Sequence, residues 1–134
     1  MQLIGKGKVL GIDIDIRAHN RSEIEKHPMK KRIEMIEGSS LDPSVVQLVK
    51  KYAKGKKKIM VCLDSNHTHT HVLRELELYA NFTSVGSYCV VFDTVIEDLP
   101  KGMYDRNWDK GDNPKTAVFE FLKRSEERRV GKEC

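Results

Sequence analysis

The chain has little cysteine and no long hydrophobic run. Cys62, Cys89 and the terminal Cys134 are an odd number without close spacing, which argues against a disulfide framework or a zinc ribbon. Cys62 and Cys89 lie in apolar, strand-like runs, where cysteine is typically a small buried hydrophobic residue. No apolar run approaches the ~20 residues of a membrane-spanning helix, and the first residues lack a signal-peptide layout. We therefore expect no transmembrane segment and a reducing, cytoplasmic location.

Glycine and proline are also scarce, with nine and four residues among 134. The chain is 39% hydrophobic and 33% charged, which is typical of one globular domain. The net charge of +4 is small, and the basic runs Lys26–Arg32 and Lys54–Lys58 contain no Phe, Trp or Tyr. Because nucleic-acid surfaces interleave basic and aromatic residues, we expect no nucleic-acid partner.

Strand-like and helix-like segments alternate along the chain. Short runs rich in apolar or β-branched residues predict strands at Val9–Ile14, Arg32–Glu37, Ile59–Leu63 and Ser87–Phe92. The run Ile59–Leu63 is apolar throughout, which predicts a strand covered on both faces. Helices are predicted at Arg21–Lys26, from Pro43 to Gly55, at Val72–Tyr79 and at Asn113–Lys123, with Asp42 and Asn113 as caps. The alternation predicts an α/β fold with a parallel sheet.

Polar residues follow each predicted strand, and ligands of parallel sheets bind at these carboxyl ends. An acid there can accept hydrogen bonds from a ribose diol, so Asp13 is the first candidate for a nucleotide-type cofactor and Asp15 the second. Gly38, Ser39 and Ser40 leave room for a flat ring, although an ordinary turn into a helix explains them as well.

Asp64 and Asp93 also end predicted strands. If these strands are neighbours, the two carboxylates meet at one edge and can bind Mg²⁺ or a similar cation through oxygen. The alternative is that each aspartate caps a following helix, and the two roles are compatible.

Three histidines alternate in the segment His67 to His71. They follow a strand and lead into a helix, so His67 and His71 should diverge from His69. A histidine-ligated metal hydrolase or oxygenase is therefore disfavoured, and a polar loop with one histidine near substrate is favoured. At the end of the chain, residues 125–134 are charged and show no periodicity. We therefore expect a domain over residues 1–124 and a polar tail over residues 125–134. The composition of this tail also fits an appended, non-native sequence.

Five long blocks resemble, in order, the cephalosporin hydroxylase and rhamnosyl O-methyltransferase family. They are KGKVLGIDIDIRAHNR, RIEMIEGSSLDP, VCLDSNHTHTHVLRELELYA, VGSYCVVFDTVIEDLP and NPKTAVFEFL. The resemblance runs from about Leu3 to Lys123 and implies the Rossmann-like, three-layer fold of class I S-adenosylmethionine-dependent methyltransferases. It also implies a divalent metal site like that of catechol O-methyltransferase.

The resemblance implies a role for each strand end. Asp13 would lie by the ribose of S-adenosylmethionine, with Asp15 nearby, and Gly38, Ser39 and Ser40 would lie by its adenine. Asp64 and Asp93 would bind the metal, and His67 is a conceivable catalytic base. The family typically carries Glu-Asp where this chain has Phe92 and Asp93, so one expected carboxylate is replaced by a phenyl ring.

The resemblance also implies that the first strand, with its glycine-rich turn, and the last strands of the fold are missing. We therefore expect a fragment of an O-methyltransferase that by itself binds S-adenosylmethionine poorly and is inactive. The acceptor would be a hydroxyl of a sugar or an antibiotic-like small molecule, and the full-length protein could form a homo-oligomer. The alternative is a non-catalytic nucleotide-binding α/β module or an inactive fragment.

Overall fold

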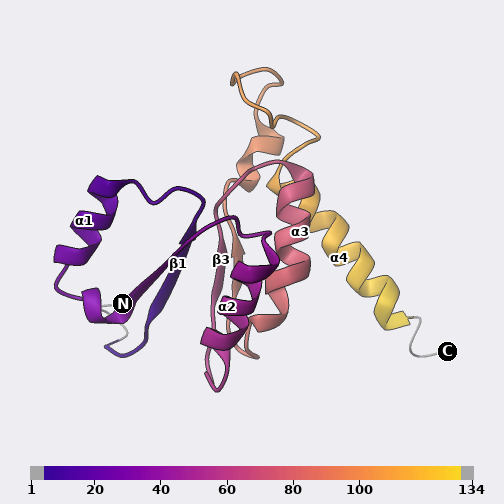
Figure 1. Cartoon of the computed structure of the whole chain (residues 1–134). Coiled ribbons are helices and arrows are strands. Elements are labelled where there is room, and N and C mark those ends of the chain that lie inside the picture. The colour runs from indigo at the N-terminus through magenta and orange to yellow at the C-terminus, as the bar shows by residue number, and fades with distance from the viewer. Residues whose placement is uncertain (1–4, 131–134) are drawn as a thin grey trace. The chain divides into compact units, whose positions relative to one another are not determined.

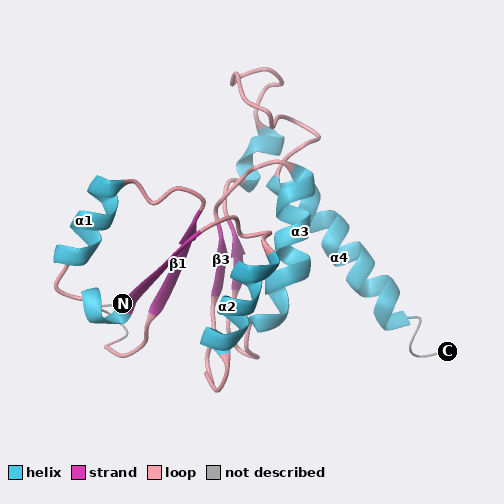
Figure 2. Cartoon of the chain, in the orientation of Figure 1, coloured by secondary structure: helices cyan, strands magenta, loops and turns pink. Residues whose placement is uncertain are grey.

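The computed structural model describes residues 5–130, which divide into two compact units between Lys50 and Lys51 (Figure 1). Helices and strands alternate through both units, as the sequence predicts (Figure 2). The first unit contains β1 (Val9–Asp13), α1 (Ala18–Lys26), the 3-10 helix η1 (Lys30–Arg32), β2 (Ile33–Glu37) and the start of α2 (Pro43–Ala53). The second contains β3 (Val61–Leu63), α3 (His69–Tyr79), η2 (Ala80–Phe82), β4 (Cys89–Val91), η3 (Thr94–Asp98) and α4 (Pro114–Val130).

The strands pair in parallel within each unit. In the first, β1 runs beside β2 with Asp13 opposite Glu37; in the second, β3 runs beside β4 with Leu63 opposite Val91. The predicted parallel pairing is confirmed, and the fold is of the α/β type. Over the described residues, however, the strands form two separate two-stranded sheets, so the predicted three-layer sandwich is not confirmed.

The turn between β2 and α2 depends on a glycine and an aspartate. Gly38 has φ +153°, and a Cβ atom there would lie 2.9 Å from Val45 Cγ2, so a side chain would be both strained and obstructed. Asp42 accepts a hydrogen bond from the Ser44 backbone N–H at 2.7 Å, as expected of a helix cap. Hydrogen bonding to Ser44 lowers the pKa of Asp42.

The core of the second unit lies around α3, which packs against β3 and along α4 (Figure 1). Apolar side chains from these elements and η3 are buried: Leu63, Val72, Leu73, Leu76, Tyr79, Ile96 and Ala117. The unit therefore has a helix-on-sheet core that fixes the carboxyl ends of β3 and β4. Burial, together with the nearby Glu75 carboxylate, raises the pKa of Tyr79 to about 12.

The prediction that Ile59–Leu63 is covered on both faces is wrong. Leu63 is 8% exposed, whereas Met60 is 61% exposed and Cys62 is also exposed. Successive side chains of a strand point to opposite faces, and only the face of Leu63 packs on the core. Cys62 is thus not the buried residue expected, while Cys89 is half-buried and its thiol pKa is raised by that burial.

The last helix is longer than predicted, because α4 continues past Lys123 to Val130. Arg124 joins α4 to α3 through an ion pair with Glu77 at 3.0 Å, and it also pairs with Glu120 on its own helix. Of the predicted polar tail, residues 131–134, including Cys134, lie outside the described residues. No helix in the described part of the chain is both long and apolar enough to cross a bilayer.

Candidate functional site

The carboxyl ends of β3 and β4 bring two aspartates to one edge of the second unit. The parallel pairing continues beyond the strands, since the Phe92 backbone N–H donates to the Leu63 carbonyl at 3.0 Å. Asp64 and Asp93 directly follow these two residues. Ligand atoms of Asp64, Asp93 and a third residue, His67, all lie within 4.8 Å of one another.

His67 lies against both carboxylates. Its Nε2 atom is 2.5 Å from Asp93 Oδ2 and 3.7 Å from Asp64 Oδ1. The imidazole is 22% exposed, whereas the Asp64 and Asp93 side chains are 57% and 53% exposed. The half-buried ring therefore forms the inner side of a group whose carboxylates face solvent.

Asp93 has an unusual backbone conformation. Its φ is +53° and its ψ is 28°, and within residues 5–130 it is the one non-glycine residue with a positive φ. Aspartate tolerates this left-handed region better than most residues, but such conformations cost about 1–3 kcal/mol and concentrate at functional sites. Although Asp93 precedes η3, its side chain makes no capping hydrogen bond. Its carboxylate is instead directed to His67.

The donor set of this group suits a divalent cation. Carboxylate oxygens are the usual ligands of Mg²⁺ and Ca²⁺, and an imidazole nitrogen extends the range to Mn²⁺ and other transition metals. The sequence analysis predicted that Asp64 and Asp93 lie at one edge of the sheet. It considered His67 as a base, or as a metal ligand only together with His69 and His71, and not as a ligand beside the two aspartates. The position of His67 three residues after a strand-end aspartate was the available signal that it could also reach a metal.

The other two histidines of the segment lie elsewhere. His69 contacts two residues of α4, with Nδ1 2.8 Å from Thr116 Oγ1 and Nε2 2.8 Å from Glu120 Oε2. His71 Nε2 lies 3.5 Å from Glu75 Oε1 on its own helix. The three imidazoles thus contact different residues and do not converge on one point.

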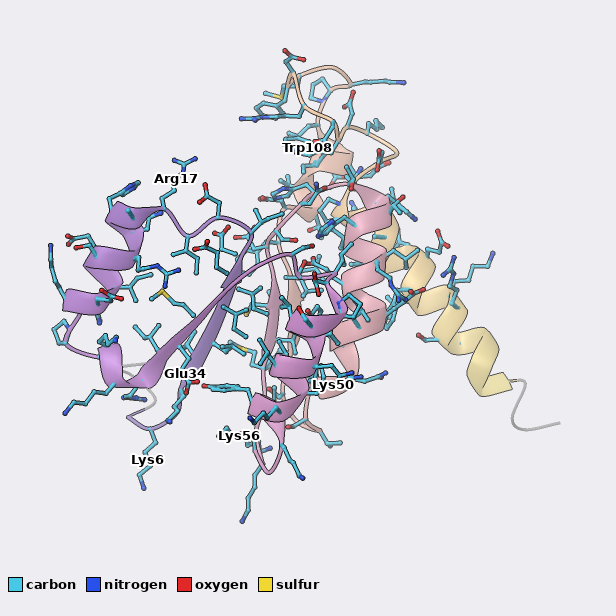
Figure 3. All side chains as sticks on the ribbon, in the orientation of Figure 1. Lys6, Arg17, Glu34, Lys50, Lys56 and Trp108 are labelled. Carbon is cyan, nitrogen blue, oxygen red and sulfur yellow. The ribbon has the colours of Figure 1, made fainter. Side chains whose placement is uncertain are left out.

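A loop between η3 and α4 places aromatic residues beside this group. The Trp108 ring centroid lies 5.6 Å from that of His67, and Tyr104 lies 5.6 Å from Trp108. Figure 3 shows Trp108 on this loop. No periodic pattern marks loop residues, so the sequence analysis missed both aromatics; the single tryptophan of the chain was the one available signal.

Two carboxylates hold this loop in place by accepting hydrogen bonds from its backbone. Asp109 accepts hydrogen bonds from the backbone N–H groups of Lys110 at 2.7 Å and Gly102 at 2.9 Å, and these bonds lower its pKa. Glu97 accepts from the Gly111 N–H at 2.7 Å and from the side chain of the fully buried Asn113, which lowers the pKa of Glu97. The loop is therefore tied to η3 and to the start of α4.

The predicted cofactor residues all lie in the first unit. The Gly38 backbone N–H donates to the Asp13 carbonyl at 2.8 Å, and the Asp15 N–H donates to Asp13 Oδ1 at 3.1 Å. The Ser39 hydroxyl accepts from the Leu41 N–H at 3.2 Å, and Ser40 is adjacent. The ends of β1 and β2 thus lie side by side, with the Asp13 and Asp15 carboxylates exposed.

Known proteins similar to this chain are methyltransferases by name. Rhamnosyl O-methyltransferases from Mycobacterium tuberculosis (strain H37Rv) and Mycobacterium bovis (strain BCG / Pasteur 1173P2) are 40% identical to it over 68 residues. That match covers 48% of this chain but only 27% of each relative. No solved structure matches the chain significantly. The family model described as rhamnosyl O-methyltransferase/CmcI matches residues 1–134, and the chain therefore belongs to this family.

Proposed function

We propose that the full-length protein transfers a methyl group from S-adenosylmethionine to a hydroxyl of a sugar, with the help of a divalent cation. The observation that carries the proposal is the group of Asp64, His67 and Asp93 at the ends of two paired parallel strands. Membership of the family supports methyl transfer to oxygen. The names of the relatives favour a sugar over an antibiotic-like acceptor.

The proposed cofactor residues are those at the ends of β1 and β2. Asp13 and Asp15 would accept hydrogen bonds from the ribose hydroxyls, as strand-end acids do in nucleotide-binding α/β folds. Gly38, Ser39 and Ser40 would lie by the adenine. The parallel pairing of β1 and β2 places these two groups of residues at the same edge of the sheet, which supports the assignment.

The proposed chemistry at the second unit uses its three polar side chains. Asp64 and Asp93 would hold a divalent cation, which when bound supplies Lewis-acid chemistry that makes a nearby hydroxyl more acidic. The contact with Asp93 uses His67 Nε2 as the donor. His67 would therefore accept the hydroxyl proton on its other ring nitrogen, Nδ1, and the Asp93 carboxylate would stabilise the resulting imidazolium. The acceptor oxygen then forms a bond to the methyl carbon while the carbon–sulfur bond breaks and its electron pair goes to sulfur. Holding the two reactants in line is the main contribution of the protein.

The test is transfer of a labelled methyl group from S-adenosylmethionine to a rhamnoside by the full-length protein. We expect a sugar methyl ether as product and at least about a hundredfold loss of kcat in His67→Gln, since a positioned base contributes roughly 10²–10⁴. His19→Gln, an exposed histidine of the first unit, is the matched control and should retain activity. Absence of transfer to any hydroxyl acceptor, with cofactor and cation bound, would reject the proposed function.

A further inference from the structure

We propose that Trp108 and Tyr104 form a stacking platform for the sugar ring of the acceptor. This inference rests on the proposed function and adds the part of the site that would select a pyranose. Both residues lie in the loop between η3 and α4, away from the strand ends in the sequence.

The platform extends outward from the polar group. The Trp108 ring is tilted by 50° to the His67 ring, and the Tyr104 ring by 55° to that of Trp108, with both centroid separations at 5.6 Å. Trp108 is half-buried, while Tyr104 is 49% exposed. Neither residue belongs to the buried core around α3. Aromatic surface is thus left accessible next to the side chains proposed to carry the chemistry.

The loop that carries Trp108 and Tyr104 is held in place by hydrogen bonds that do not involve these two side chains. Asp109 binds two backbone N–H groups of the loop, and Glu97 binds the Gly111 N–H. The Asn113 side chain donates to the Asp109 carbonyl at 3.0 Å and to Glu97. Because polar bonds hold the loop in place, the aromatic rings are not needed as its internal packing. A loop held in place with one half-buried and one exposed aromatic ring is a surface arranged in advance for a ligand.

The chemistry of the surface fits a pyranose. The face of an aromatic ring carries partial negative charge, which attracts the C–H groups on the apolar face of a sugar. The hydroxyls of the sugar project from the ring edge, so a sugar stacked on Trp108 can direct one hydroxyl toward His67. Adenine would also stack on an aromatic face, but its proposed place is at the turn of Gly38, Ser39 and Ser40 in the first unit.

The experiment compares variants of the full-length protein. Trp108→Ala, Trp108→Phe and Tyr104→Ala are assayed for the KM of methyl α-L-rhamnopyranoside and of S-adenosylmethionine, and ligand-observed NMR measures binding of the rhamnoside alone. Trp108→Ala should raise the acceptor KM and weaken rhamnoside binding roughly tenfold, the effect of losing one stacked ring. The KM of S-adenosylmethionine should not change, and Trp108→Phe should retain most of the affinity. Tyr88→Ala, which removes an aromatic that is 73% exposed at the opposite end of β4, should behave as wild type.

The outcomes separate the platform from the proposed function. Rhamnoside binding that depends on Trp108, without methyl transfer by wild type, would support the platform and reject the proposed function. Methyl transfer with an unchanged acceptor KM in Trp108→Ala would reject the platform alone. A rise in the KM of S-adenosylmethionine, or displacement of the rhamnoside by adenosine, would also reject it, because the rings would then bind adenine. If Trp108→Ala does not fold by circular dichroism, Tyr104→Ala decides: a raised acceptor KM would support the platform, and wild-type behaviour would reject it.

Discussion

At the scale of single residues, the group at the ends of β3 and β4 combines what the sequence could predict with what it could not. Parallel strands place their carboxyl ends together, so the meeting of Asp64 and Asp93 follows from two strand predictions. The left-handed backbone of Asp93 and the 2.5 Å contact of its carboxylate with His67 depend on how the chain leaves β4. No pattern of residues in the sequence predicts this backbone conformation after β4.

Phe92 gives a prediction about the metal. The resemblance expects a glutamate at this position, and Phe92→Glu should tighten Mg²⁺ binding by about tenfold or more, since changes beside a metal commonly alter affinity 10–100-fold. Calorimetric titration of Mg²⁺ measures the change. Val95→Glu, which adds the same charge at a position 56% exposed in η3, is the control for general electrostatic attraction. Equal affinities of the two variants would mean that position 92 does not face the site.

Gly38 gives a prediction about stability. Its φ of +153° and the 2.9 Å approach of a Cβ to Val45 Cγ2 mean that Gly38→Ala must strain the turn after β2. We expect a loss of about 1–3 kcal/mol in the free energy of unfolding, measured by urea denaturation. Gly11→Ala is the matched control, because its nearest neighbour would be 4.0 Å away. A Gly38→Ala variant as stable as Gly11→Ala would contradict this account of the turn.

At the scale of elements, local sequence signals predicted which segments are helices and which are strands better than they predicted where these elements end. The apolar runs identified all four strands, and Asp42 and Asn113 cap helices as expected. The end of α4 was missed because the charged run after Lys123 looked like a tail, although Glu, Arg and Lys are good helix formers. The exposure of one face of β3 was also missed, since burial depends on which elements cover the strand rather than on the strand itself.

Asn113 should be the most sensitive position at the start of α4. Its side chain accepts from the Lys115 N–H at 3.0 Å and donates to Glu97 and to the Asp109 carbonyl, and it is fully buried. Asn113→Ala removes the cap and the hydrogen bonds to the half-buried Glu97 and Asp109, so we expect about 1–3 kcal/mol of destabilisation in thermal or urea unfolding. Asn81→Ala, at an exposed position in η2, should be nearly neutral. A small effect at Asn113 would mean that water replaces these bonds.

Glu97 links the same loop to pH. Hydrogen bonds from Gly111 and Asn113 lower its pKa below the ordinary 4.5. A lowered folded-state pKa stabilises the fold above the unfolded-state value, and that stability is lost as pH falls through the folded-state pKa. Glu97→Gln should therefore be less stable than wild type at pH 7, and the difference should close as pH falls below 4.5. Melting curves at several pH values test this; a difference that is constant down to pH ~2 would assign the effect to packing instead.

At the scale of the whole molecule, chemistry-bearing residues occupy the strand ends of both units. Asp13 and Gly38, at the ends of β1 and β2, belong to the first unit. The group of Asp64, His67 and Asp93 belongs to the second unit. The parallel α/β type was predictable because alternating strands and helices rarely fold otherwise. The division into two sheets could not be predicted, since it depends on which strands pair with one another. Trp108 and Tyr104 were not foreseen as part of the site, since a loop held by polar bonds leaves no periodic trace in the sequence.

The central claim is that Asp64 and Asp93 bind the divalent cation used in methyl transfer. The most direct measurement is calorimetric titration of Mg²⁺ and Mn²⁺ into the full-length protein, its Asp64→Asn and Asp93→Asn variants, and Glu23→Gln as a control carboxylate that pairs only with exposed Lys26 among the described contacts. We expect one saturable site in wild type and in Glu23→Gln, and its loss in both aspartate variants. Cation binding that survives both aspartate substitutions, or no binding by wild type, would contradict the account.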